Sequence, residues 1–579
     1  MQQRWGVPFV AWPTRLKPNY WDGVALPLVL GSVMLIAWAS QQMNVPYHPG
    51  ETLPMSLDPR MLPEYGLRTV MRMVLALAAS LVFSLVYAAA AAKSRRAEKI
   101  LIPILDILQS VPILGFLSIT VTGFVALFPG RLLGYECAAI FAIFTSQAWN
   151  MTFSLYQSFI SVPHDLREAA RMYHLSAWQS FWQLEVPFAL PQLVWNMMMS
   201  VSGGWFFVVA SEAISVAGNN VLLPGIGSYI SLAIDQSNLA AVFYAIIAML
   251  VLIVIYDQLL FRPLIAWAQR FKFEEIGQDE IEPPWFLVML QRARLFDLLS
   301  RLADAAIGLL SRASQAMERR VPLPQRARGR QHPIFDRLWN AALLLGALAA
   351  LVEMALYIHA EVGWSEVGHV VTLGMITLLR VAVLIVLASL IWVPIGVWIG
   401  LRPRLARHIQ PFIQFLAAFP ANLFFPLAVS AIVALRLNPE IWLSPLMILG
   451  TQWYILFNVI AGTLALPTDY QLVAGNLGVK RWLWWRRLVL PGIFPAFVTG
   501  AVTASGGSWN ASIVAEIVKW GDTTLHATGI GAYIAEETQK GDFPRIALGI
   551  TVLCIFVLLF NRLLWRRLYA LAEERLRLD

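Results

Sequence analysis

The chain has 579 residues, of which 58% are hydrophobic and 13% are charged, and its mean hydropathy is +0.64. Soluble domains carry about 25% charged residues, so this composition excludes an ordinary soluble protein and indicates an integral membrane protein. The net charge of +8 would suggest a nucleic-acid partner in a soluble chain. Here we assign it to cytoplasmic loops and expect no nucleic-acid binding.

Apolar runs of about 20 residues, long enough to cross the bilayer as helices, recur along the chain. The predicted fold class is therefore an all-α polytopic membrane protein with about 12 transmembrane helices. Six spans fit the first half and six fit the second: 24–40, 67–92, 100–128, 133–161, 187–210 and 240–262, then 337–360, 369–400, 409–435, 441–465, 491–514 and 544–562. The run from Val24 to Ser40 lacks a cleavage pattern and is interpreted as a retained helix.

Lys and Arg in short loops set the orientation, because cytoplasmic loops are enriched in them. Basic clusters occupy Lys93–Lys99, Arg402–Arg407, Lys480–Arg487 and Arg562–Arg567, whereas the alternate loops are acidic. One arrangement satisfies all of these loops, and it places both termini in the cytoplasm.

Two polar islands interrupt the apolar sequence at matching positions. Pro163–Pro191 and Pro467–Pro495 both open with Pro, carry an Asp two positions later (Asp165 and Asp469) and close with a Pro-x-x-x-Pro pair. At the same offset of 304, Trp205 matches Trp509 and Glu212 matches Glu516; upstream, at an offset of 308, Thr69-x-x-Arg72 matches Thr377-x-x-Arg380. With six spans in each half, these are tandem repeats in parallel topology. Both islands are predicted to lie in the cytoplasm.

The repeat divides the chain into six predicted segments. These are an N-terminal tail, first span and periplasmic loop (1–65), a first repeat (66–262), a cytoplasmic linker (263–336), an extra span (337–373), a second repeat (374–566) and a cytoplasmic tail (567–579). The middle of the linker has apolar residues at helical spacing with Arg between them. It fits a helix on the inner leaflet or a helix packed on the protein's own flank, and both interpretations stay open.

Motifs for catalysis or metal binding are missing from the sequence. There is no G-x-x-x-x-G-K-[ST] phosphate loop and no H-E-x-x-H or Cys/His cluster, and the two cysteines, Cys137 and Cys554, lie in different halves. We therefore predict a chain that is not an enzyme, with no catalytic residue, no metal site and no cofactor.

The first island contains Glu168-Ala169-Ala170 followed by His174, and the second keeps Ala474 and Gly478 at the matching places. This pattern resembles the E-A-A-x-x-x-G signature of the membrane subunits of binding-protein-dependent ABC importers of the type I fold. Thr69-x-x-Arg72, Ser202–Trp205 with Glu212, and Ser505–Trp509 with Glu516 are similar to the nitrate, sulfonate and taurine permease group. The first island lacks the glycine, and the second has Leu472-Val473-Ala474 in place of E-A-A.

This resemblance implies a membrane permease of an ATP-driven importer in the bacterial inner membrane, with an anion as the solute class. The implied partners are two cytoplasmic ATPase subunits, a periplasmic or lipid-anchored solute-binding protein and the lipid bilayer. The ATPases are expected to dock on residues of the islands: Asp165, Glu168, Ala169, Ala170, His174, Asp469, Ala474, Gly478, Arg486 and Arg487. Asp165 suits a helix N-cap, and the Ala pair suits close docking. His174 and Gly478 are expected to mark a turn between two short helices, at which His would be strained or would force another turn.

The translocation path is expected to involve residues on the spans that resemble the lining helices of this fold: Arg72, Trp205, Glu212, Arg380, Trp509, Asn510 and Glu516. Each has an alternative interpretation. Arg72 and Arg380 could extend to the membrane interface, the tryptophans could belong to an interfacial belt, and the glutamates could terminate helices. The Gly225 and Gly529 turns are predicted to be structural.

Two other functions stay open at this stage. A secondary transporter of six plus six spans would need ion-coupling carboxylates in the bilayer, and the candidates Glu136 and Glu353 have no partner in the repeat. A membrane-embedded enzyme would need clustered His, Asp or Glu, which the sequence does not offer.

Overall fold

The computed structural model describes residues 53–216, 219–268 and 333–575, with single positions between 23 and 47 and at 271, 286 and 288. The chain divides into two compact units. One contains Ser161–Val194 with the described parts of 1–41 and 255–325, and the other contains the rest, including most of both repeats. Most of the predicted span at 24–40 and of the linker at 263–336 lies outside the described residues.

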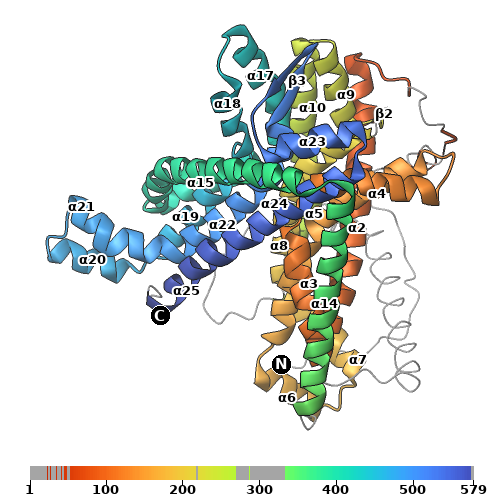
Figure 1. Ribbon diagram of the computed structural model, residues 1–579. Coiled ribbons are helices and arrows are strands. Elements are labelled where there is room, and N and C mark those ends of the chain that lie inside the picture. The colour runs from red at the N-terminus through yellow and green to blue at the C-terminus, as the bar shows by residue number, and fades with distance from the viewer. Residues whose placement is uncertain are drawn as a thin grey trace. The chain divides into compact units, whose positions relative to one another are not determined.

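Long helices make up the first repeat (Figure 1). A single 3-10 turn, η1 (Pro59–Met61), leads into the helices α2 (Leu62–Lys93), α3 (Arg95–Ser110), α4 (Ile113–Leu127) and α5 (Leu133–Ile160). The polar island forms α6 (His164–Met172), α7 (Ala177–Ser180) and the π-helical η2 (Phe181–Glu185), and it is followed by α8 (Val186–Glu212). A hairpin of β1 (Ala213–Val216) and β2 (Asn219–Leu222) precedes α9 (Ile226–Asp235), α10 (Leu239–Tyr256), the π-helical η3 (Asp257–Phe261) and α11 (Arg262–Ala268).

The second repeat follows the same order after the extra helix α14 (Pro333–Glu361). Its helices are α15 (Trp364–Gly400), α16 (Pro403–Ala418), α17 (Phe425–Ala434) with the 3-10 turn η5 (Ala421–Phe424), α18 (Pro439–Trp442) with η6 (Ser444–Met447), and α19 (Gln452–Leu464). The second island forms α20 (Thr468–Asn476), α21 (Arg481–Trp484) and η7 (Trp485–Val489), and leads into α22 (Leu490–Ala515). The hairpin β3 (Ile517–Trp520) and β4 (Thr523–His526) precedes α23 (Ile530–Lys540), α24 (Phe543–Phe560), η8 (Asn561–Trp565) and α25 (Arg566–Arg575).

Within the described residues, six helices are long and apolar enough to cross a membrane, and the number rises to nine if each of three bent helix pairs is one span. These findings show an all-α polytopic membrane protein. The bent pairs are α3–α4, α16–α17 and α18–α19, so the stretches predicted as spans at 100–128, 409–435 and 441–465 are each a broken span or a re-entrant loop. The breaks of the first two pairs are marked by Pro112 and Pro420, which cannot donate a backbone hydrogen bond. The total of 12 spans stays a prediction.

The two hairpins were not predicted, because the sequence indicated turns at Gly225 and Gly529 and no strands. Each hairpin is antiparallel, pairing Ala213 with Leu222 and Ile517 with His526. The second hairpin reaches the first repeat: Lys519 pairs with Asp235 at 2.9 Å, and the Gly521 N–H donates to the Ile234 carbonyl at 2.9 Å. The hairpin ends of the repeats are thus joined.

Each island ends its first helix with the same backbone turn. In the first, the Leu175 N–H donates to the Ala170 carbonyl and His174 has φ +53°; in the second, the Val479 N–H donates to the Ala474 carbonyl and Gly478 has φ +66°. Both are Schellman turns with a left-handed residue after the helix. The structure has a turn at both predicted positions, and His174 takes the left-handed conformation without forcing a different turn.

Exchanging the residues at this turn should shift stability in opposite directions. His174→Gly removes a side chain from the left-handed region and should raise the free energy of unfolding by about 0.5–1 kcal/mol, and Gly478→His should lower it by a similar amount. Thermal unfolding of the detergent-solubilised chain measures both. A shift of the same sign in the two variants would contradict this account of the turn.

Candidate functional sites

A buried carboxylate lies at the C-terminal end of α8 in the first repeat. Glu212 is the last residue of α8, and its Oε1 accepts hydrogen bonds from Thr69 Oγ1 at 2.7 Å and from Arg72 Nη1 at 2.7 Å. Its Oε2 accepts from the Gly227 N–H at 2.7 Å. The Thr69 hydroxyl in turn accepts from the Ile226 N–H at 3.1 Å. Glu212 therefore joins α2, α8 and the N-terminus of α9, where the helix dipole favours a negative charge.

Arg72 lies at the centre of this cluster and is fully enclosed. It makes a two-pronged ion pair with Glu136, Nε to Oε2 at 2.6 Å and Nη2 to Oε1 at 2.7 Å, and it also donates to the Pro224 carbonyl at 3.0 Å. The side chains of Arg72 and Glu212 are 0% exposed. One guanidinium is thus shared by two carboxylates, the kind of charge-assisted contact for which its planar fork is suited.

The second repeat builds the same cluster in a more open form. Glu516 accepts from Thr377 Oγ1 at 2.7 Å, from Arg380 Nη1 at 3.3 Å and from the Gly531 N–H at 2.8 Å. Arg380 also pairs with Glu440 and donates to the Thr528 carbonyl at 2.7 Å. Here the Arg380 side chain is 12% exposed and that of Glu440 is 44% exposed. The first cluster is sealed, whereas the second opens to its surroundings.

These clusters change the interpretation of the two arginines. Arg72 neither extends to the membrane interface nor presents a positive charge to a solute, because two carboxylates surround it. The statement that Glu136 has no partner in the repeat is wrong: Glu440 lies 304 residues later and pairs with Arg380 as Glu136 pairs with Arg72. The pattern that could have revealed it is the Thr-x-x-Arg spacing, which places both side chains on one helix face toward a buried acid.

Glycine is required where each carboxylate meets the next helix. A Cβ at Gly225 or Gly529 would overlap the carboxylate of Glu212 or Glu516, and one at Gly227 would overlap the Val209 carbonyl. The predicted structural role of the Gly225 and Gly529 turns is confirmed.

The remaining path candidates lie on the same two helices. Trp205 and Trp509 are 1% exposed, so neither ring belongs to an exposed interfacial belt. Glu212 and Glu516 lie at the C-terminal ends of α8 and α22, which agrees with the interpretation that the glutamates terminate helices. Asn510 is half-buried, and its Oδ1 accepts from the Ile113 N–H of the first repeat at 2.8 Å.

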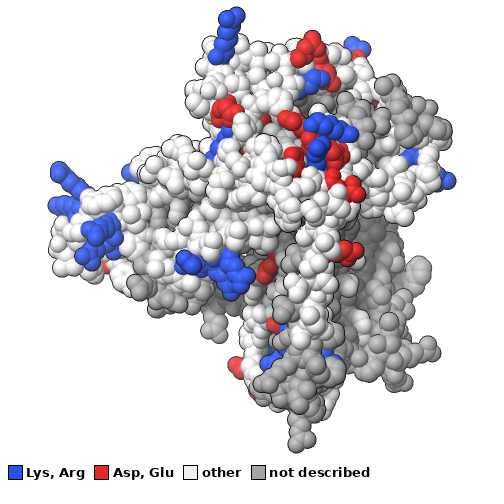
Figure 2. Space-filling model, in the orientation of Figure 1, with Lys and Arg blue, Asp and Glu red and all other residues white. Residues whose placement is uncertain are grey.

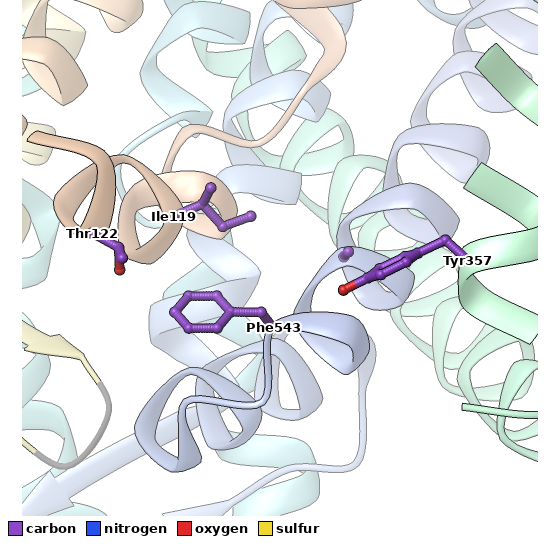
Figure 3. Close-up of a pocket in the computed structure, with 5 residues that line it drawn as sticks. Ile119, Thr122, Tyr357 and Phe543 are labelled. Atoms are coloured by element: carbon purple, nitrogen blue, oxygen red, sulfur yellow. The ribbon is translucent and has the colours of Figure 1, made fainter. Parts of the chain in front are cut away.

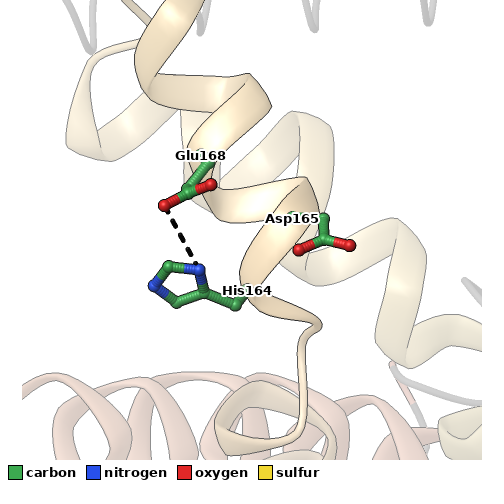
Figure 4. A group of neighbouring side chains, drawn as sticks. All are labelled: His164, Asp165 and Glu168. Atoms are coloured by element: carbon green, nitrogen blue, oxygen red, sulfur yellow. Dashed lines mark ion pairs between the residues drawn. The ribbon is translucent and has the colours of Figure 1, made fainter.

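The helix α6 displays the charged residues of the first island. Figure 4 shows His164, Asp165 and Glu168 on its first turns, and an ion pair of 3.3 Å joins His164 Nδ1 to Glu168. All three are exposed. Asp165 is not the N-cap, because Pro163 takes that place. Asp165 lies in the first turn of α6, where its negative charge interacts favourably with the helix dipole.

The alanines of the islands lie on the side of the helices that faces the protein, away from the exposed charged residues. Ala170 and Ala474 are buried and Ala169 is half-buried, so the flat Ala-Ala surface expected for docking is not an exposed face. Asp469 lies in the first turn of α20, as Asp165 does in α6. The exposed surface of the second island is apolar and basic, with Leu472, Val473, Leu477, Trp482, Arg486 and Arg487.

A shallow pocket of about 300 Å³ lies between α4, α14 and α24. Ile119, Thr122, Tyr357, Phe543 and Ala547 line it, and Figure 3 shows the rings of Phe543 and Tyr357 beside it. Its lining carries no charged group, so it lacks the converging polar groups expected of a solute site.

Comparison with known protein families shows the family to which this chain belongs. The model of the binding-protein-dependent transport system inner membrane component matches the chain twice, at residues 80–261 and 392–578, which together are more than half of it. The chain belongs to this family. Both permease repeats expected from the sequence carry the family match, and the family consists of transport components of membranes.

Relatives of this permease have names that refer to small anions. It is 31% identical over 186 residues to the bicarbonate transport system permease protein of Synechococcus elongatus, covering 32% of this chain and 64% of that protein. It is 28% identical over 187 residues to the nitrate import permease protein of Leptolyngbya laminosa, covering 32% and 63%. The taurine transport system permease protein of Escherichia coli is 26% identical over 197 residues, covering 33% and 67%. The chain thus spans somewhat less than two thirds of the first two relatives.

Replacing the arginine of the first cluster should lower the stability of the chain more than replacing the arginine of the second. Arg72→Gln leaves two buried carboxylates without a cation and should cost about 3–5 kcal/mol of stability. Arg380→Gln should cost clearly less, because Glu440 is 44% exposed and can be hydrated. Thermal unfolding in detergent measures both, and Arg60→Gln at an exposed position is the control, with a change of about 0.5 kcal/mol or less. Equal losses for Arg72 and Arg380 would refute the difference between the two clusters.

Proposed function

We propose that this permease is the solute-conducting membrane component of an ATP-driven importer. The observation that carries the proposal is the duplicated island. Two exposed helix–turn–helix elements, α6–α7 and α20–α21, occupy the same place in two repeats that match the family. A motor outside the chain needs stiff projections through which to act on the spans, and these elements have that character.

Two ATPase subunits are the proposed partners of these elements. In the first, the exposed surface of α6 is charged, with Asp165 and Glu168, and His174 lies in the turn beyond it. In the second, apolar side chains accompany Arg486 and Arg487, and Figure 2 shows basic residues gathered over α20–α21. Because positive charge favours the cytoplasmic side, both elements and both chain termini are assigned to the cytoplasm. The buried alanines Ala170 and Ala474 would support the docking helices from within.

A solute-binding protein is the proposed partner at the opposite, hairpin end. Acidic residues gather there around α23, with basic residues among them (Figure 2). The proposed solute class is a small anion, because relatives are named for bicarbonate, nitrate and taurine. An acidic outer end does not attract free anions, so delivery by a binding protein fits better than capture from solution.

The two arginine clusters take a structural part in this proposal. Each one fixes the hairpin end of α8 or α22 to α2 or α15 of the same repeat. The path itself is assigned to α8 and α22, near Trp205, Trp509 and Asn510, and the clusters of Arg72–Glu212 and Arg380–Glu516 frame its outer end. The segments 1–65, 263–336, 337–373 and 567–579 are proposed to lie outside the two permease domains, 66–262 and 374–566.

Uptake by reconstituted vesicles tests the proposed function. With the ATPase subunits and binding protein present, we expect uptake of bicarbonate, nitrate or taurine that requires ATP and is lost when ATP is replaced by a non-hydrolysable analogue. A transporter driven by an ion gradient would instead work without the ATPase and stop when the proton gradient is collapsed. That outcome would overturn the proposal in favour of a secondary transporter.

Charge reversal on the islands should weaken the motor contact. Glu168→Lys combined with Arg486→Glu and Arg487→Glu should reduce co-purification of the ATPase at least tenfold, because like charges then face each other at both contacts. The exposed Asp522 at the hairpin end provides the control: Asp522→Lys should leave co-purification unchanged. Membrane insertion, read from yield and thermal unfolding, should be the same in all variants. Undiminished co-purification of the triple variant would count against docking at these residues.

A further inference from the structure

One set of contacts that joins the two repeats follows one face of α8. Trp195 stacks near Phe457 with ring centroids 6.2 Å apart, Met198 Sδ lies 2.7 Å from Gln414 Nε2, and the Phe206 carbonyl accepts from Asn422 Nδ2 at 3.2 Å. These positions, 195, 198 and 206, recur at helical spacing, and together they define the seam between the repeats. Among the described residues, these contacts along the seam involve uncharged groups.

The matching face of α22 is polar and uncovered over much of its length. Thr499, Thr503, Gly506 and Asn510 recur at intervals of four, three and four residues, and the first three are exposed. At the offset of 304 they match Trp195, Met199, Ser202 and Phe206 of α8. We call Thr499, Thr503, Gly506 and Asn510 the polar stripe. A polar face within a span is expected to border the bundle interior or a water-filled path rather than lipid.

The stripe ends at a contact that crosses the seam. Pro112 precedes α4 and has no side-chain acceptor, so the first N–H groups of α4 need a partner from elsewhere. Asn510 supplies one: its Oδ1 accepts from the Ile113 N–H at 2.8 Å and thus caps a helix of the other repeat. Asn422, at the equivalent helix break of the second repeat, bonds to Phe206, the residue that matches Asn510. Its Oδ1 is buried without a protein partner.

We propose that the solute path follows the polar stripe of α22 along the seam, and that Asn510 and Asn422 contact the solute at the two helix breaks. This inference rests on the proposed transport function and deepens it. It assigns recognition to uncharged hydrogen-bonding groups, because Arg72 and Arg380 are held by carboxylates. The solute class is a small polar molecule that passes without a fixed positive charge in the path.

Thiol labelling tests the position of the path without knowledge of the solute. In a chain with Cys137→Ala and Cys554→Ala, which removes the two free thiols, Thr503→Cys places one cysteine on the stripe. Leu379→Cys, at a position 66% exposed on α15, is the matched control on an apolar face. Water is needed to form the reactive thiolate, so we expect Thr503→Cys to react with a charged thiosulfonate at least tenfold faster. Equally slow reaction at both positions would overturn the path.

Reagents of opposite charge test whether the proposed path contains a fixed charge. After correction for their rates with a free thiol, a negatively and a positively charged thiosulfonate should label Thr503→Cys within about threefold of each other. A preference for the negative reagent of more than tenfold would show a cationic path and would overturn recognition by uncharged groups.

Asn510→Asp separates solute contact from helix capping. The carboxylate keeps an acceptor for the Ile113 N–H, and it suits a helix N-terminus, so the fold should persist. An added negative charge in the path should lower anion uptake at least tenfold. Asn238→Asp makes the same change at an exposed cap of α10, where Asn238 Oδ1 accepts from the Ala241 N–H at 3.1 Å, and should leave uptake unchanged.

The outcomes distinguish this inference from the proposed function. If the unaltered chain takes up anions with ATP and Asn510→Asp does so equally well, contact at Asn510 is refuted while the transport function stands. If the unaltered chain takes up nothing in the presence of its ATPase, the transport function itself fails. The unfolding temperatures of the two variants provide the control for folding. We expect Asn510→Asp, which keeps the cap of α4, to unfold at a higher temperature than Asn510→Leu, which loses it.

Discussion

The rest of the structure depends on a guanidinium held between two carboxylates at the outer end of each repeat. Burying these charges is costly, and the cost is offset because Arg72 meets Glu136 and Glu212 with direct, short hydrogen bonds. Glu212 and its counterpart Glu516 also accept hydrogen bonds from the N-terminus of the helix that follows the hairpin. One electrostatic constraint therefore fixes three elements at once, and it explains why glycine stands at Gly225 and Gly529.

The two clusters share their connections but differ in their surroundings. In the first repeat, Tyr47 N–H donates to the Gly130 carbonyl and Tyr47 packs edge-on against Tyr135, which covers the loop that leads to Glu136. The equivalent Glu440 in the second repeat remains substantially exposed. A chain built from two similar repeats thus has one closed and one open arginine cluster.

Much of this architecture could be predicted from the residues. The repeat, the polar islands and the turns at His174 and Gly478 follow from patterns that stay within one segment. The missed features require side chains from segments far apart: Glu440 lies at the repeat offset of 304 from Glu136, but their ion pairs with Arg72 and Arg380 bring together helices that are distant in sequence. The hairpins were missed because four-residue strands such as Ala213–Val216 carry too little alternation to be distinguished from a turn. Burial of Ala170 was missed because α6 exposes its charged face and hides this one.

The different faces of α8 and α22 have a consequence for how such a protein can change over time. In a permease assembled from two identical chains, every codon substitution appears on both sides of the seam, so a polar residue gained on one side is gained on the other. Covalent duplication removes this restriction. Trp195 and Thr499 show such a difference, since Trp195 packs near Phe457 whereas Thr499 is an exposed polar residue.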